Sequence, residues 1–105
     1  MTRSYAFRLY VSGQSERSSA AESNLRALAG ARLPDGFELE VVDVVARPGL
    51  AEEQRVLATP TVVRLLPHPQ LRVIGDLSDP PRVAYALGLP DEPQEVRMEK
   101  EAGGD

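Results

Sequence analysis

The stretch Leu-Ala-Thr-Pro-Thr-Val-Val-Arg-Leu-Leu, at residues 57–66, decides the fold. Residues 50–58 are mostly good helix formers. The step Thr59–Pro60 is expected to end the helix, because the residue before a proline is disfavoured in a helix. Residues 61–66 are mostly β-branched or apolar and predict a strand. We therefore predict a short helix over 50–58, with Glu52 and Glu53 in its first turn, followed directly by a strand.

Downstream of this stretch, a turn and a second strand complete a predicted hairpin. The sequence Pro-His-Pro at 67–69 predicts the turn, and residues 71–74 predict the strand. A last helix is predicted to begin at Ser78 or Asp79 and to carry prolines 80 and 81 in its first turn, where a missing N–H group does no harm.

Upstream, two predicted strands flank a predicted helix. Period-two alternation indicates strands over 5–11 and 37–45, and the apolar end of the second predicts burial on both faces. Ser19 with Glu22 fits a capping box and begins a helix predicted over 19–29. The whole order, βαβαββα, is the thioredoxin-like α/β layout. In that layout the proline that opens the third strand is often preceded by a cis peptide bond.

Length and composition exclude several classes of function. The chain has 105 residues, which predicts a single domain over 1–90 and a disordered acidic tail over 91–105. It contains no cysteine and one histidine, which excludes disulfides, thiolate metal sites, multi-histidine metal sites and a cysteine nucleophile. The net charge of −4 argues against nucleic acid as the main partner. No stretch resembles a membrane span or a signal peptide, and we expect a cytoplasmic protein.

The loop after the first predicted strand is where a thioredoxin-like oxidoreductase carries its cysteine pair, and this chain has Ser15 and Ser18 there. Without a thiol, the scaffold is predicted to be a binding protein that is not an enzyme and holds no cofactor. Either serine can cap the following helix, an interpretation favoured over activation of a bound thiol. The alternative function is glutathione binding, for which the candidate residues are Thr59, Pro60, Asp76, Ser78 and Asp79. Glutathione transferases normally need a second helical domain, for which 105 residues leave no space.

Two runs are more diagnostic than any catalytic motif in the chain: Leu-Ala-Thr-Pro-Thr at 57–61 and Ile-Gly-Asp-Leu-Ser at 74–78. Further matching stretches are Leu9–Gln14, Val42–Val44 followed by Pro48, Leu50–Glu53, and Leu66–Pro67 followed by Pro69. All of them fall within about residues 5–89. In order and spacing, this set resembles the KaiB family of bacterial circadian clock proteins.

The resemblance implies a regulator that binds the first ATPase domain of a KaiC-type hexamer and modulates its phosphorylation cycle. It implies two states: a ground state of order βαββααβ, usually a homotetramer, and a monomeric thioredoxin-like state that binds KaiC. The bound form would capture KaiA and displace a SasA-type kinase. The half after about residue 50 would be rebuilt between the states, and Pro60, Pro67 and Pro69 bracket a run that can store alternative isomers.

Carried over residue by residue, the resemblance assigns a set of candidate KaiC-binding residues: Arg47, Pro48, Leu50, Glu52, Glu53, Arg55 and Val56. The arginines would supply charge pairing, and Leu50 and Val56 would supply apolar contact. Arg8 and Asp43 are weaker candidates for a surface that faces KaiA. No catalytic residue and no metal ligand is predicted.

The last segment departs from the family pattern. Where many relatives have a glycine and an acidic residue, this chain has Ala86 and Gly88, and Pro90 falls where the ground state would form its last strand. Alanine favours a helix, and proline weakens a strand. We therefore predict that this chain populates the thioredoxin-like state more than a typical relative does.

Overall fold

Seven elements follow one another along residues 4–92, the part of the chain that the structure, a computed structural model, describes. They are β1 (Ala6–Val11), α1 (Glu16–Arg32), β2 (Glu38–Asp43), α2 (Pro48–Glu53), β3 (Thr61–Leu66), β4 (Leu71–Ile74) and α3 (Pro80–Ala86). This is the predicted order βαβαββα. The predicted acidic tail lies outside the described residues from residue 93 onwards.

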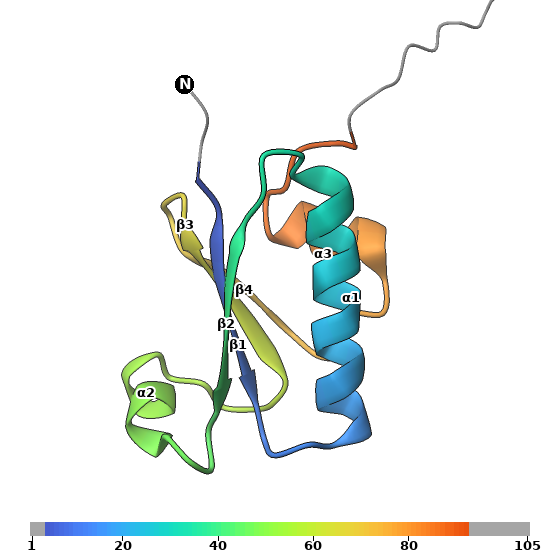
Figure 1. The fold of residues 1–105 in the computed structure, drawn as a ribbon. Coiled ribbons are helices and arrows are strands. Elements are labelled where there is room, and N and C mark those ends of the chain that lie inside the picture. Colours follow the sequence, from blue (N-terminus) through green and yellow to red (C-terminus); the bar gives the residue numbers. More distant parts are fainter. Residues whose placement is uncertain (1–3, 93–105) are drawn as a thin grey trace, which may run out of the picture.

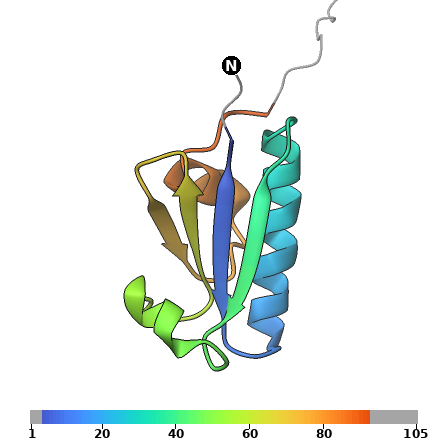
Figure 2. The ribbon, with the colours of Figure 1, turned by 60° about the vertical axis from the view of Figure 1, so that its left-hand side comes forward.

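The four strands form one mixed sheet in the order β2-β1-β3-β4. β1 runs parallel to β2 and antiparallel to β3, so that Leu9 lies between Val41 on one side and Val62 on the other. β3 and β4 form the predicted antiparallel hairpin. Helices α1 and α3 cover one face of the sheet, whereas α2 lies at one end of the opposite face (Figures 1 and 2). Much of that opposite face is therefore left without a covering helix.

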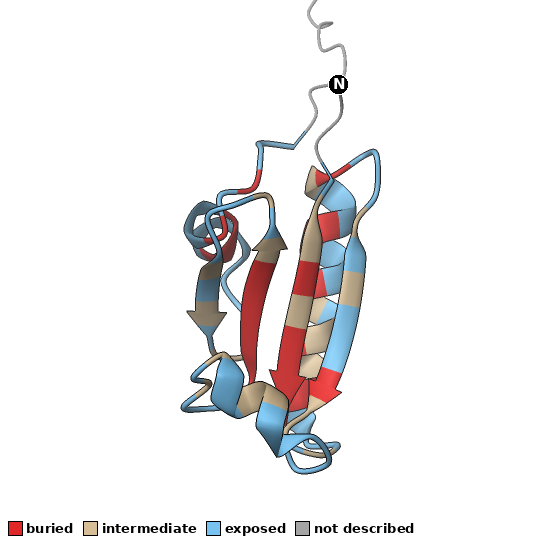
Figure 3. Ribbon diagram, turned by 90° about the vertical axis from the view of Figure 1, so that its left-hand side faces the viewer, coloured by how far each residue is buried: buried red, intermediate tan, exposed pale blue. Residues whose placement is uncertain are grey.

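Side chains along β1 and β3 point alternately to the two faces of the sheet, and a cluster of buried residues forms on each face. On the α1 and α3 side, Phe7 and Leu9 pack with Leu25 of α1 and Leu87 at the end of α3, all almost completely buried. On the α2 side a smaller cluster holds Tyr10, Val42 and Val63, with Leu50 and Val56 packed against it. Figure 3 shows that the buried residues of the sheet concentrate on its two central strands.

β2 differs from the prediction, because it is an edge strand and is not buried on both faces. Of its residues only Val42 is buried, while Glu38, Glu40 and Val41 are exposed. An apolar run indicates a buried strand, but it does not distinguish a central position from an edge position. Charged residues suit an edge, since they oppose pairing with another chain.

Helix α1 begins earlier and ends later than predicted. Ser15, not Ser19, is the N-cap, and its Oγ accepts a hydrogen bond from the Ser18 N–H at 3.1 Å. The helix continues through Gly30 to Arg32 and is closed by the backbone bond from Leu33 N–H to the Ala29 carbonyl at 2.9 Å. Leu33 is buried, and packing of this residue offsets the roughly 1 kcal/mol that a glycine costs inside a helix.

Helix α2 spans Pro48–Glu53 and not the predicted 50–58, whereas the chain from β3 onwards agrees closely with the prediction. Strands β3 and β4 have the predicted bounds, and Asp79 caps α3 by accepting a hydrogen bond from the Arg82 N–H. The peptide bond before Pro60, which opens β3, is cis, as are those before Pro67 and Pro69. Within residues 4–92, no helix combines the length and the apolar character needed to cross a membrane.

Candidate functional site

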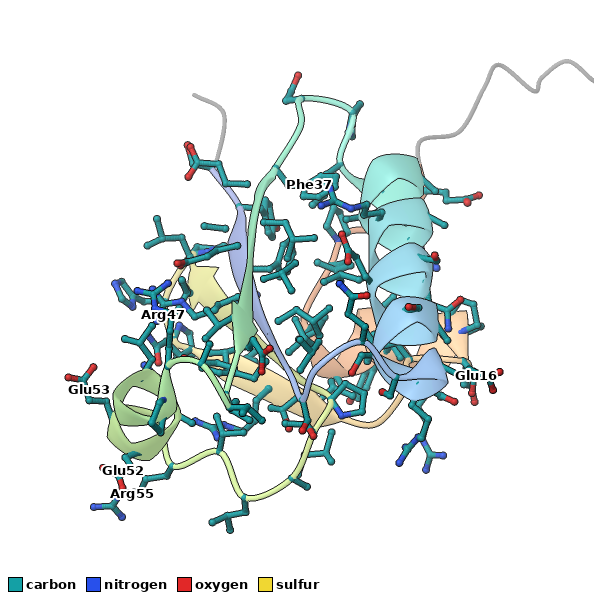
Figure 4. The ribbon with its side chains drawn as sticks, turned by 60° about the horizontal axis from the view of Figure 1, so that its bottom comes forward. Glu16, Phe37, Arg47, Glu52, Glu53 and Arg55 are labelled. Carbon is teal, nitrogen blue, oxygen red and sulfur yellow. The ribbon has the colours of Figure 1, made fainter. Side chains whose placement is uncertain are left out.

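The seven candidate KaiC-binding residues lie together in the segment formed by α2 and its flanking turns, which we call the α2 surface (residues 45–57). Five of the seven are exposed: Arg47, Pro48, Glu52, Glu53 and Arg55. Figure 4 shows Glu52, Glu53 and Arg55 projecting from the end of α2 away from the sheet. Because the helix covers Pro48–Glu53 only, both glutamates lie in its last turn and not in the predicted first turn.

The two apolar candidates have a different position. Leu50 and Val56 are partly buried and pack against Tyr10, Val42 and Val63 on the sheet. They therefore anchor α2 to the domain, and only part of each side chain is available to a partner.

Two exposed apolar side chains flank the α2 surface, and the sequence interpretation did not single them out. Val45 is 72% exposed before the helix and Leu57 is 91% exposed after it. The sequence pattern predicts Val45 inside a longer strand and Leu57 inside a longer helix. The observed elements stop at Asp43 and Glu53, so both side chains fall in turns and reach solvent.

The helix α2 ends in a Schellman turn, a helix C-terminus in which two backbone N–H groups bond back to the last carbonyl groups. The Arg55 N–H donates to the Glu52 carbonyl at 3.1 Å, and the Val56 N–H donates to the Ala51 carbonyl at 2.9 Å. Arg55 is left-handed, with φ at 55°. A residue with a side chain costs roughly 1–2 kcal/mol more than glycine in this conformation.

A polar network connects the α2 surface to the open face of the sheet. Arg8 Nε donates to Glu40 Oε1 at 2.8 Å, and Arg47 Nη1 lies 3.6 Å from Glu40 Oε2. Arg8 Nη1 also donates to the Tyr10 hydroxyl at 3.3 Å, and this bond, followed by the one to Glu40, raises the pKa of Arg8. The two candidates Arg8 and Arg47 thus share Glu40, which the sequence interpretation did not identify.

Asp43, the other weak candidate, ties two loops together. Its Oδ1 accepts hydrogen bonds from the backbone N–H groups of Gly13 at 3.2 Å and Val45 at 2.9 Å. The carboxylate thus holds the turn after β2 against the loop after β1, beside a shallow cavity of about 290 Å³.

The features that motivated the glutathione alternative have structural roles here. Ser15 caps α1, and Asp79 caps α3. A cavity of about 370 Å³ between β4 and α3 is lined by Asp76, Ser78 and Asp79, but its lining includes neither Thr59 nor Pro60. Among the residues that the structure describes, no group of three or more His, Cys, Asp or Glu side chains could hold a metal ion.

A four-stranded sheet in this order, with α1 and α3 on one face and α2 on the other, defines a thioredoxin-like domain. The N-terminal domain of Synechococcus elongatus SasA has this fold, with a TM-score of 0.67 and 23% identity over 84% of this chain and 87% of that one. Mitochondrial thioredoxin 3 of Saccharomyces cerevisiae matches with a TM-score of 0.63 and 21% identity, covering 80% of this chain and 76% of that chain.

The sequence comparisons identify the family. The KaiB domain model matches residues 8–89. The circadian clock oscillator protein KaiB of Prochlorococcus marinus is 42% identical over 83% of this chain and 74% of its own length. The circadian clock protein KaiB3 of a Synechocystis species is 37% identical over 87% of this chain and 89% of its own length. The chain belongs to the KaiB family, as its sequence motifs predicted.

Proposed function

We propose that this protein is a non-catalytic clock or clock-like regulator that binds a KaiC-type ATPase hexamer through the α2 surface and modulates its phosphorylation cycle. The observation that carries the proposal is the exposure of five charged or proline candidates on one segment, flanked by Val45 and Leu57. Burying one such apolar side chain against a partner contributes about 1.5–3 kcal/mol. The chain's membership of a clock-protein family supports the choice of partner.

We propose two further partners for the protein. A KaiA-type protein would meet the face that carries Arg8 and Asp43, and a SasA-type kinase would compete for the ATPase. The SasA N-terminal domain shares this chain's fold, which is consistent with two similar shapes that compete for one site. We place the encounter in the cytoplasm.

Substitution of Leu57 tests the binding surface. Leu57→Asp is expected to weaken binding to the KaiC-type ATPase of the same organism, in the presence of ATP, at least tenfold (~1.4 kcal/mol). A charge would replace the most exposed apolar side chain of the α2 surface. The measurement is surface plasmon resonance on the immobilised hexamer, and the matched control is Tyr85→Asp, whose side chain is 89% exposed on α3.

Equal weakening by both substitutions would contradict the assignment of the α2 surface. If the wild-type protein forms no complex with the ATPase and instead shows saturable glutathione binding in a thermal-shift assay, the glutathione alternative is favoured.

We also propose that the protein changes fold between a homotetrameric ground state and the monomeric thioredoxin-like state, with Pro60, Pro67 and Pro69 in the segment that is rebuilt. The two packings would then differ by roughly a few kcal/mol. In the thioredoxin-like arrangement, α3 buries Val83 and Ala84, and the adjoining Leu87 is also buried. These contacts support a state in which residues 80–86 are helical.

The state of the free protein can be measured by NMR chemical shifts. We expect helical shifts over 80–86 and no strand shifts over 86–91, because Ala86 favours a helix and Pro90 weakens a strand. Residues 6–11, a strand in the structure and in the half that the resemblance leaves unchanged, serve as the internal control. A spectrum in which residues 86–91 show only strand shifts would contradict the prediction that this chain favours the thioredoxin-like state.

A further inference from the structure

The turn that ends α2 places a charged residue where glycine is the usual choice. Arg55 has φ at 55°, and the backbone bonds around it are those of a Schellman turn. Only one other described residue besides the glycines, Leu77, has a positive φ, and Leu77 is buried. Packing in the core accounts for Leu77, whereas Arg55 is exposed and has no such explanation.

One arginine on the sheet forms hydrogen bonds to the backbone of this turn. Arg72 of β4 donates from Nη2 to the Gln54 carbonyl at 2.7 Å and from Nη1 to the Arg55 carbonyl at 3.3 Å. A cation at these carbonyls also complements the negative end of the helix dipole. Since α2 contains no buried residue, Arg72 and the packing of Leu50 and Val56 determine how the helix sits on the sheet.

The side chain of Arg55 has no charged partner within the described domain. It takes part in none of the salt bridges found in residues 4–92. In Figure 4 it projects from the turn away from the sheet. Arg55 thus adopts an unfavourable backbone conformation, and the hydrogen-bonded turn sets the direction in which its exposed side chain leaves the backbone. An unfavourable conformation of this kind is a reason to look for a function of the side chain.

We infer that Arg55 is a specificity-determining residue that pairs with a carboxylate on the partner, and that Arg72 is a positioning residue that fixes the direction of Arg55. This inference rests on the proposed function, because it names the chemistry of the partner surface that would meet the α2 surface. A guanidinium group carried on a backbone turn that is already fixed before binding pairs with a carboxylate at a smaller loss of backbone freedom.

A double-mutant cycle tests the inference, with affinity for the KaiC-type ATPase and the melting temperature as readouts. Arg55→Gly is expected to raise Tm by a few degrees, because glycine accepts the left-handed conformation, and to weaken binding about tenfold. Arg72→Met is expected to weaken binding about fivefold in the wild-type background and to have no effect on binding in the Arg55→Gly background.

Two further variants separate charge from folding. Arg55→Asn tolerates the left-handed conformation without the charge and should bind as weakly as Arg55→Gly, whereas Arg55→Lys should recover most of the affinity. The loss caused by Arg55→Gly should shrink as salt is raised from 50 to 500 mM, since screening weakens the ion pair in the wild-type complex.

Each outcome bears on the inference. If Arg72→Met weakens binding equally in both backgrounds, Arg72 does not act through Arg55, and the inference is wrong. If the wild-type protein binds the ATPase and the Arg55 variants bind equally well, the inference fails while the proposed function stands. If the wild-type protein forms no complex, both fail.

Discussion

Replacing Arg64 by alanine is expected to lower the free energy of unfolding by about 3 kcal/mol, because this buried arginine joins three segments of the C-terminal half. Arg64 lies on β3 and is 5% exposed. Its Nη1 donates to the Leu87 carbonyl at the end of α3 at 2.9 Å, and its Nη2 donates to the Pro69 carbonyl in the hairpin turn at 2.8 Å. Urea unfolding followed by circular dichroism measures the effect. Arg82→Ala, at an exposed position of α3, is the control and should stay within about 0.5 kcal/mol of the wild-type protein.

Gly88 provides an independent check of this contact. A Cβ atom at Gly88 would lie 2.8 Å from Arg64 Nη1, and the residue has φ at +65°. Gly88→Ala should therefore destabilise the wild-type protein through both a clash and an unfavourable backbone conformation. In the Arg64→Ala background only the cost of the backbone conformation, about 1–2 kcal/mol, should remain. An equal cost of Gly88→Ala in both backgrounds would show that the guanidinium does not occupy this position.

Leu25→Ala is expected to lower the free energy of unfolding by about 3–4 kcal/mol. Leu25 is completely buried in the larger core, so that the substitution removes apolar contact and leaves a cavity between α1 and the sheet. The matched control is Leu57→Ala, which makes the same chemical change at a side chain that is 91% exposed and should change stability by less than about 0.5 kcal/mol. Thermal and urea unfolding of the two variants would contradict the described core if their losses were equal.

Local patterns predicted the C-terminal half of the fold best. The bounds of β3 and β4 were correct, since prolines at 60, 67 and 69 mark the points where the strands begin and end. The start of α1 was wrong, because Ser15 and Ser19 both fit an N-cap and only the folded loop distinguishes them. The edge position of β2 depends on which strands pair with β1, which its own sequence does not encode.

The family resemblance predicts a binding site on the segment around α2, and that assignment stays a prediction. The structure shows where its residues lie: five of the seven are exposed on this segment, and Leu50 and Val56 are partly buried. Which apolar side chains face the sheet and which face solvent was not predictable. Leu50 and Val56 pack on the sheet, whereas Val45 and Leu57 are exposed, and this difference depends on where α2 ends. That end is determined by the left-handed Arg55 and by Arg72, which lies on a distant strand.

The strand order has a consequence for hydrogen exchange. In the sheet order β2-β1-β3-β4, the two strands before α2 are neighbours and so are the two strands after it. A single boundary, between β1 and β3, therefore separates the elements before α2 from those after it. The boundary is crossed by the β1–β3 ladder, by packing between α1 and α3, and by side-chain bonds such as Asn24 to the Asp76 carbonyl at 2.8 Å. Opening along it would release β3, β4 and α3 as one block and leave β1, α1 and β2 paired. We therefore expect hydrogen exchange to separate the amide protons of the two sides into two groups with distinct free energies of opening.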